Sequence, residues 1–218
     1  MKYKEITKNK EINAYLEKGN ANLGQLGFTD HSQAHCVQVA HQAGKILEWF
    51  GYSEHEVELV RIAGYMHDIG NAINRTHHAE YGALLANDLL KDTDMSLEDR
   101  ITIISAIGNH DESTGDPEDV ISAALIIADK TDVRRSRVRQ KEKSAFDIHD
   151  RVNYAVTDSK LKIAKDKSVI ALNLQIDENI CSMYDYFEIF LERMMLCRKS
   201  AEVLGTTFKL TVNGRKVL

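Results

Sequence analysis

The spacing of the apolar residues constrains this chain most strongly, because up to about residue 135 they recur mostly every three or four positions. That spacing is typical of helices that bury one face. Only one proline, Pro117, interrupts the sequence, so long helices are allowed. We expect helices near residues 30–50, 54–68, 77–91, 97–109 and 118–135, with a further candidate over 5–18.

Residues that begin helices occur where this pattern requires them. Ser53 and Glu56 have the spacing of a capping box. Asp116 supplies a cap before Pro117, a residue well suited to the first helical position. Three other helices also have suitable caps: Thr29 or Asp30, Thr76 and Ser96.

After about residue 155 the apolar period changes to two, which indicates strands. A strand over residues 170–176 can pair with one near 160–164. A long amphipathic helix then ends at Gly205, and a strand over 208–212 precedes the turn pair Asn213-Gly214. We therefore predict a mainly α chain, with a helical domain over residues 20–150 and a small ββαβ extension over 155–218.

Length and composition exclude several classes of protein. With 218 residues and 43% hydrophobic content, the chain can bury a core without disulfides. Its three cysteines form no CxxC pair, which favours a reducing cytoplasm and argues against a thiolate zinc site. Neither a signal peptide nor an apolar run long enough for a membrane span is expected. The net charge of −5 argues against overall attraction to nucleic acid or anionic lipid.

Imidazoles and carboxylates occupy the core-facing side of several predicted helices. His35 lines up with Val39 and Ala43, and Asp129 lines up with Leu125. A single histidine on such a face is more often a hydrogen-bonded core residue than a ligand. Several such groups in one bundle need mutual hydrogen bonds or a cation, because unpaired buried charges are costly. The candidate metal ligands are His35, His67, Asp68, His78, His110 and Asp129.

The donor types limit which metal can bind. Imidazole and carboxylate without thiolate suit Mn²⁺, Fe²⁺, Co²⁺, Ni²⁺ or Zn²⁺, and Mg²⁺ fits if water fills much of its coordination shell. An adjacent His-Asp pair at a helix end can direct one group each towards neighbouring metals. We therefore expect one or two divalent ions, with Asp68 as a possible bridge.

Five short motifs follow one another along the helical part. They are HCVQVAHQA from His35, HDIG from His67, HHAEYGA containing His78, AIGNH ending at His110, and IIADK containing Asp129. In this order they resemble the HD-domain superfamily of metal-dependent phosphohydrolases, of which HDIG is a typical form. The third and fourth motifs resemble a branch with dinuclear metal sites, which includes enzymes that cleave dinucleoside polyphosphates. The resemblance covers about residues 25–140 and implies an HD-domain helical bundle.

The resemblance also implies a role for each residue. One metal would be held by His35, His67, Asp68 and Asp129, and a second by Asp68, His78 and His110. His67 and Asp68 would form the catalytic centre, where metal-activated water attacks phosphorus. Two other ligands stay open, because His31 shares the face of His35 and His77 adjoins His78. Three residues are candidates for proton transfer: Asp68, Asp111 and Asp132.

A basic run, RRSRVRQKEK over residues 134–143, contains six basic side chains and one acid. Such runs are usually solvated surface. This one begins just after Asp129, where cations would meet a substrate phosphate. Substrate contact and a surface salt bridge are equally open for four residues: Arg75, Lys130, Arg134 and Arg135.

We therefore expect a metal-dependent hydrolase of phosphate esters or phosphoanhydrides, acting on a nucleotide such as a dinucleoside polyphosphate. One alternative is a nucleotide phosphatase or phosphodiesterase of the same fold. Another is a non-catalytic domain that binds metal or nucleotide for regulation. The C-terminal extension is then available for a partner or for a second copy of the chain in a homo-oligomer.

Overall fold

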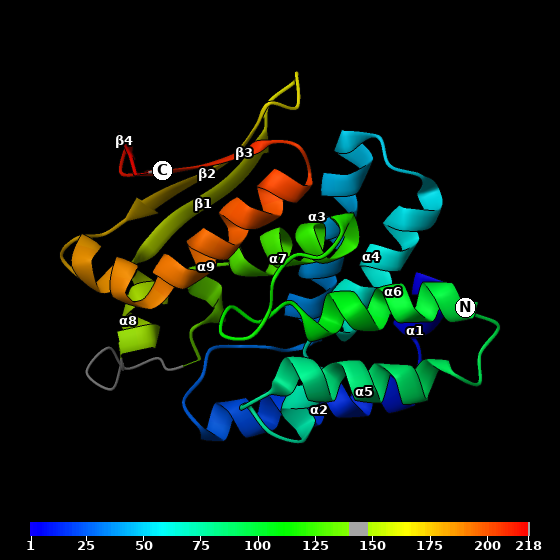
Figure 1. The fold of residues 1–218 in the computed structure, drawn as a ribbon. Helices are drawn as coiled ribbons and strands as arrows, with labels where there is room; N and C mark the ends of the chain where they lie inside the picture. Colours follow the sequence, from blue (N-terminus) through cyan, green and yellow to red (C-terminus); the bar gives the residue numbers. More distant parts are fainter. Residues whose placement is uncertain (140–147, 218) are drawn as a thin grey trace.

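The described residues, 1–139 and 148–217, form a bundle of helices followed by a small sheet (Figure 1). This computed structural model confirms the predicted fold class, a mainly helical chain with a C-terminal extension. No helix in these residues is long and apolar enough to cross a membrane. The bundle contains α1 (Tyr3–Ile6), α2 (Lys10–Gln25), α3 (Gln33–Phe50), α4 (Glu54–Met66), α5 (His78–Leu90), α6 (Leu97–Gly108) and α7 (Val120–Lys130), with 3₁₀ turns η1 (Ile69–Ala72) and η2 (Arg135–Arg137).

The C-terminal part is a sheet of strand order β1-β2-β3-β4. β2 and β3 are parallel, because α9 crosses over between them, and the other two pairs are antiparallel. Leu172 in β2 lies opposite Leu161 in β1 and Leu210 in β3. The short β4 adds one strand to the predicted ββαβ unit. The elements are α8 (Ile148–Ala155), β1 (Val156–Ile163), β2 (Val169–Ile176), α9 (Met183–Val203), β3 (Thr207–Val212) and β4 (Arg215–Lys216).

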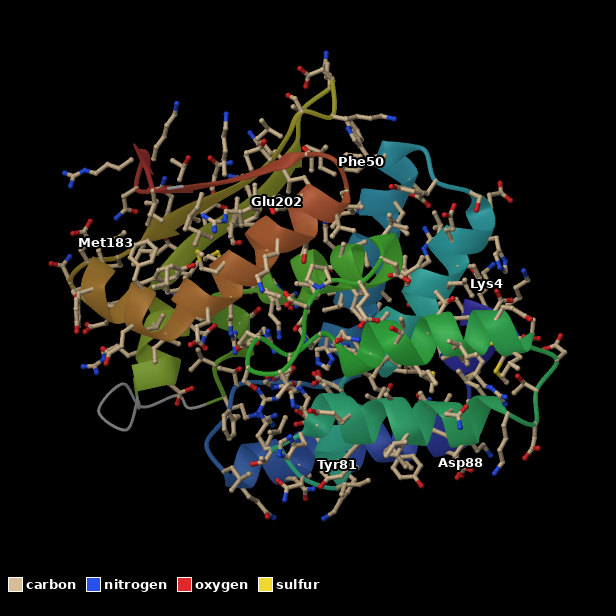
Figure 2. The ribbon with its side chains drawn as sticks, in the orientation of Figure 1. Lys4, Phe50, Tyr81, Asp88, Met183 and Glu202 are labelled. Carbon is tan, nitrogen blue, oxygen red and sulfur yellow. The ribbon has the colours of Figure 1, made fainter. Side chains whose placement is uncertain are left out.

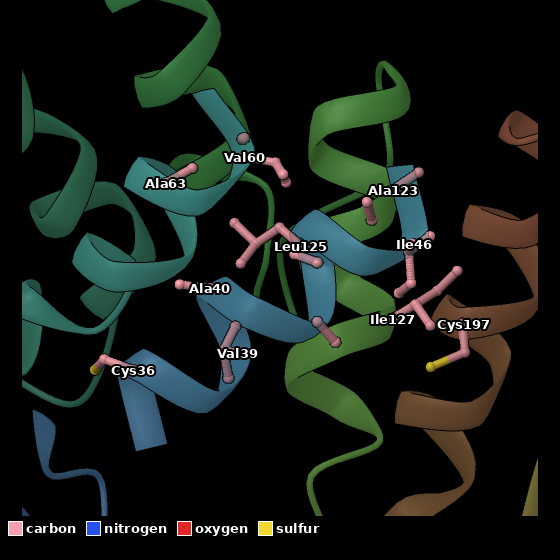
Figure 3. Packing of buried hydrophobic residues seen from close by; sticks show 14 of the residues in the cluster. Cys36, Val39, Ala40, Ile46, Val60, Ala63, Ala123, Leu125, Ile127 and Cys197 are labelled. Atoms are coloured by element: carbon pink, nitrogen blue, oxygen red, sulfur yellow. The ribbon is translucent and has the colours of Figure 1, made fainter. Parts of the chain in front are cut away.

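Helix α9 packs on both β3 and α7 and so joins the sheet to the bundle (Figure 1). Figure 2 labels Met183 and Glu202 near its two ends. In Figure 3, Ile127 of α7 lies close to Cys197 of α9, and both are fully buried. One continuous cluster of buried apolar side chains therefore includes both parts of the chain. The division into domains over 20–150 and 155–218 stays a prediction.

Two helices begin at the predicted N-cap residue, and three begin at a different one. Ser53 and Ser96 cap α4 and α6 as predicted. Asp119, not Asp116, caps α7 and accepts a hydrogen bond from Ser122 N at 2.7 Å. Asp116 instead accepts one from Lys199 Nζ at 2.6 Å. The N-caps of α3 and α5 are Ser32 and His77.

Two predicted helix boundaries were wrong. The candidate over 5–18 is two helices, because Asn9 caps the start of α2 after α1 has ended. The helix expected over 118–135 ends at Lys130, so Arg134 and Arg135 do not lie on it. Residues 140–143 of the basic run lie outside the described residues.

Candidate metal centre

The six predicted ligands come together at one place in the bundle. The four histidines and Asp68 are at most 4% exposed, and the side chain of Asp129 is 12% exposed. Each comes from the end of an element, where side chains converge on the space between helices. His35 is in the first turn of α3, His67 and Asp68 follow α4, His78 begins α5, His110 follows α6, and Asp129 is in the last turn of α7.

Close backbone packing brings the His67-Asp68 pair next to α5. A Cβ atom on Gly70 would lie 2.0 Å from the carbonyl oxygen of His78 and 2.5 Å from the amide nitrogen of Gly82. A Cβ on Gly82 would lie 3.1 Å from the carbonyl oxygen of His67. Gly70 therefore has to be glycine for η1 to meet the start of α5, and at Gly82 a Cβ atom would be tightly packed.

The first group of donor atoms comes from α3, the end of α4 and α7. His35 Nε2 lies 3.3 Å from Asp129 Oδ1 and 3.7 Å from Asp68 Oδ2. His67 Nε2 lies 3.2 Å from Asp68 Oδ2 and 3.7 Å from Asp129 Oδ1. His35, His67 and Asp129 offer donor atoms that all lie within 4.8 Å of one another, a separation that one ion can bridge.

The second group adjoins the first through Asp68. His78 Nε2 lies 3.2 Å from His110 Nε2 and 3.8 Å from Asp68 Oδ1. These three residues also have donor atoms within 4.8 Å of one another. The two carboxylate oxygens of Asp68 thus face different groups, which is the arrangement of a bridging ligand.

The other ring nitrogen of each histidine faces an oxygen that can only accept a hydrogen bond. His35 Nδ1 donates to Asp132 Oδ2 at 2.8 Å, and His67 Nδ1 donates to the carbonyl of Gly64 at 2.8 Å. The same holds for His78 Nδ1 and the Arg75 carbonyl at 3.2 Å, and for His110 Nδ1 and the Ile107 carbonyl at 2.6 Å. Each Nε2 therefore points into the cluster, where it can bind a cation once it carries no proton.

Three buried polar atoms in the cluster have no hydrogen-bond partner: His35 Nε2, His67 Nε2 and Asp68 Oδ2. Leaving such atoms unsatisfied costs about 1–3 kcal/mol each, and more for a charged group. A divalent cation would satisfy all three, and imidazole with carboxylate is a donor set suited to first-row metals. The residues present therefore fit a metal site.

The pKa shifts agree with this chemistry. Burial and Arg75 lower the pKa of His78 to about 4, and burial and His67 lower the pKa of His110 to about 3, so both rings are neutral at pH 7. Burial alone would raise the pKa of Asp68 and Asp129. The neighbouring His67 and Lys130, respectively, hold the pKa of these carboxyls well below their usual range.

Basic side chains line the same narrow pocket as the ligands. Two of them, Arg75 and Lys130, were predicted from the sequence, and two others, Arg137 and Arg193, were not. Arg75 Nη1 lies 3.3 Å from His78 Nε2. His31, the alternative to His35, also lines this pocket, whereas His77 lines the adjoining cleft.

Arg134 and Arg135 lie elsewhere. Arg134 Nη2 donates to Asp132 Oδ2 at 2.9 Å, which pairs it with the residue that orients His35. The guanidinium carbon of Arg135 lies 4.4 Å from the ring centre of Tyr154. Neither lines the pocket that contains Asp68 and Asp129. Their contact with a substrate stays a prediction.

Cys36 lies close enough to His67 and Asp68 to be considered as a ligand. Burial, with Asp68 nearby, raises the pKa of its thiol well above the usual range, so the thiol stays protonated. Because a cysteine binds metal as the thiolate, this favours Cys36 as a small buried apolar residue over a metal ligand.

Sequence reasoning missed several residues that contact the clustered side chains or the cations beside them. Asp132 was considered only for proton transfer, although its spacing from Asp129 places both near the end of α7. Glu112 lies two residues after His110, and its Oε2 forms an ion pair with Lys130 Nζ at 2.6 Å. Arg193 comes from the C-terminal part, and no motif connects it with the site.

Comparison with known proteins agrees with this geometry. Residues 33–135 match the family model described as the HD domain, and all six clustered residues lie within that match. An uncharacterized protein of Methanocaldococcus jannaschii is 28% identical over 193 residues, which covers 78% of this chain and 74% of that protein. Such coverage cannot fit within residues 1–135, so the similarity continues into the C-terminal part. Residues 33–135 of this chain are therefore similar in sequence to the HD domain.

Proposed function

We propose that the protein is a metal-dependent phosphohydrolase that cleaves phosphate esters or phosphoanhydrides. The observation that carries this proposal is the buried cluster of imidazole and carboxylate donors, of which three atoms lack a hydrogen-bond partner. The HD domain match supports it, because proteins of this family are generally metal-dependent phosphohydrolases. A nucleotide is the proposed substrate, with a dinucleoside polyphosphate as the most specific candidate.

The cluster divides into two proposed ligand sets that share Asp68. Divalent ions held there would lower the pKa of a bound water molecule and neutralise charge on the phosphoryl group. The protein's part is to fix the donors and to exclude bulk water from them. The first set is His35, His67, Asp68 and Asp129, and the second is Asp68, His78 and His110.

Cationic side chains beside the cluster would bind the substrate phosphate. Lys130 Nζ lies 2.8 Å from Asp129 Oδ2 and 2.6 Å from Glu112 Oε2, so its charge is held at the pocket. Arg75 has no carboxylate partner among the described residues, and its guanidinium carbon lies 5.3 Å from the ring centre of Phe28. An arginine with a free edge suits bidentate contact with phosphoryl oxygens.

Two other functions use the same cluster. A nucleotide phosphatase or phosphodiesterase would differ only in the shape of the substrate cleft. A regulatory domain would bind metal or nucleotide without turnover, and a second copy of the chain or a partner would dock on the C-terminal part. Residence in the cytoplasm and homo-oligomer formation remain predictions.

Metal analysis combined with activity assays tests the proposal. Purified protein should contain a divalent transition metal and, with Mn²⁺, Co²⁺ or Mg²⁺, hydrolyse at least one compound in a panel of nucleotides and dinucleoside polyphosphates. His67→Ala and Asp68→Ala should lose both metal and activity. His55→Ala is the matched control, because His55 is exposed and pairs with Asp99 far from the cluster.

The outcomes separate the candidate functions. Unchanged metal content in both cluster variants would contradict the ligand assignment. Tight nucleotide binding without turnover under any metal would favour the regulatory function. Hydrolysis of mononucleotides alone would favour a phosphatase over cleavage of dinucleoside polyphosphates.

A further inference from the structure

Helix α9 carries a charged residue from the C-terminal part to the edge of the metal centre. α9 runs beside α7, the helix that contains Asp129 (Figure 1). Met194 and Cys197 on α9 are fully buried, and this fixes the rotation of the helix about its axis. With that rotation, Arg193 lines the pocket that also contains Asp68 and Asp129.

Two contacts hold the guanidinium group of Arg193 in place. Its Nε donates to Glu112 Oε1 at 2.8 Å, and its Cζ lies 4.9 Å from the ring centre of Phe190. The other oxygen of Glu112 pairs with Lys130 Nζ at 2.6 Å. One carboxylate thus holds two cations side by side at the pocket.

The outer edge of this guanidinium group has no partner in residues 1–139 and 148–217. Glu112 contacts only Nε, and Nη1 and Nη2 make no hydrogen bond within these residues. The side chain is 24% exposed, so the free edge can be reached from solvent. Two parallel N–H donors on a planar group match the spacing of two oxygens on one phosphoryl group.

Two other cations of the pocket are more fully occupied by the protein. Lys130 pairs with both Asp129 and Glu112. Arg137 is 6% exposed and donates to the carbonyls of Asp30 and Asp132 at 2.9 and 2.8 Å. A structural ion pair with Glu112 would explain the Nε contact of Arg193. That ion pair alone would not explain why the unpaired Nη1 and Nη2 of Arg193 lie at the pocket.

We propose that Arg193 binds a phosphoryl group with two free oxygens at the metal centre, and that Glu112 positions it. The role depends on the phosphohydrolase function proposed above. Arg193 lies outside the HD domain match, so the C-terminal part would complete the substrate site instead of forming a separate module.

Binding of inorganic phosphate to the Mn²⁺-loaded full chain tests this role by calorimetry. Arg193→Gln should weaken phosphate binding about 10- to 100-fold while metal content stays unchanged, because a charge-assisted contact is lost. Arg193→Lys should lose less, since it keeps the charge but not the planar fork. Lys199→Gln is the matched control, because Lys199 is on the same helix and pairs with exposed Asp116.

Each outcome bears on a different claim. Phosphate affinity of Arg193→Gln within about twofold of the parent, with full metal content, would overturn the role of Arg193 alone. If the metal-loaded parent protein neither binds phosphate nor hydrolyses any compound, the proposed function fails as well. If Arg193→Gln does not fold, Arg193→Lys decides, and unchanged affinity in that variant would overturn the bidentate contact.

Discussion

At the scale of single residues, the hydrogen bond on the second ring nitrogen fixes how each imidazole presents its Nε2. Three of the four cluster histidines donate from Nδ1 to a backbone carbonyl, which no side-chain substitution can remove. His35 differs, because its acceptor is the carboxylate of Asp132. The orientation of His35 can therefore be tested by changing Asp132, which is outside both proposed ligand sets.

Asp132→Ala should weaken metal binding about 10- to 100-fold, the usual effect of removing a group that orients a ligand. Asp132→Asn should lose less, because its amide oxygen still accepts from Nδ1. Asp99→Ala is the control, since Asp99 contacts the exposed His55 at 2.7 Å. Metal titration of the apoprotein measures the affinities. Equal losses in the Ala and Asn variants would contradict an orienting role that depends on the hydrogen bond.

The charge state of His67 predicts how metal binding depends on pH. Burial would lower its pKa, but Asp68 and Asp129 raise the pKa of His67 to about 10 in the metal-free protein. Both ring nitrogens are therefore protonated at pH 7, and the proton on Nε2 must leave before Nε2 can bind a metal. Metal affinity should rise up to about tenfold per pH unit between pH 6.5 and 8.5, with about one proton released. An indicator dye in weak buffer measures the release, and pH-independent affinity would contradict the prediction.

At the scale of elements, the site depends on how closely η1 approaches α5. Gly70 permits this approach, because any Cβ there would lie 2.0 Å from the carbonyl oxygen of His78. The backbone on both sides carries proposed ligands, so neither can move without separating Asp68 from His78. The second group of donors should therefore be more sensitive to this contact than the first.

Gly70→Ala should destabilise the protein by about 1–3 kcal/mol through overpacking and reduce the bound metal, with the ion at His78 and His110 lost first. Gly108→Ala is the control, because a Cβ there meets Ala83 Cβ at an ordinary 3.6 Å. That variant should be neutral or slightly more stable, since alanine favours the helix. Urea unfolding and metal stoichiometry measure both effects. If Gly70→Ala has the stability and metal stoichiometry of the parent, the backbone at this contact can shift to accommodate a Cβ atom, which would contradict the prediction.

At the scale of the whole molecule, periodicity predicted which faces are buried but not what they pack against. The alternation at Ile170 and Leu172 correctly indicated a half-buried strand. The polar groups on buried helix faces, such as His35, indicated the cluster. The Arg193–Glu112 pair joins residues 81 positions apart and depends on α9 docking beside α7. The apolar spacing within α9 does not specify which helix it packs against, so the contribution of Arg193 to the pocket could not be predicted.

Because the proposed ligands lie at the start of some helices and at the end of others, bound metal should stabilise the entire fold. Without a cation, Asp68 and Asp129 are buried with lowered pKa values, and three polar atoms of the cluster lack hydrogen-bond partners. Free metal at 100 times its Kd adds about 2.7 kcal/mol of stability, since it binds only the folded chain. For a chain of this size that corresponds to a Tm increase of about 5–10 °C.

Thermal unfolding of the apoprotein with and without Mn²⁺ measures this increase. Asp68→Ala should show no increase, because it removes the carboxylate that both proposed ligand sets share. His55→Ala should respond like the parent, since His55 is exposed and distant from the cluster. A parent protein that binds metal stoichiometrically but melts at the same temperature would place the metal outside the bundle. The buried cluster would then need another explanation, in which protons shared between imidazoles and carboxylates satisfy it.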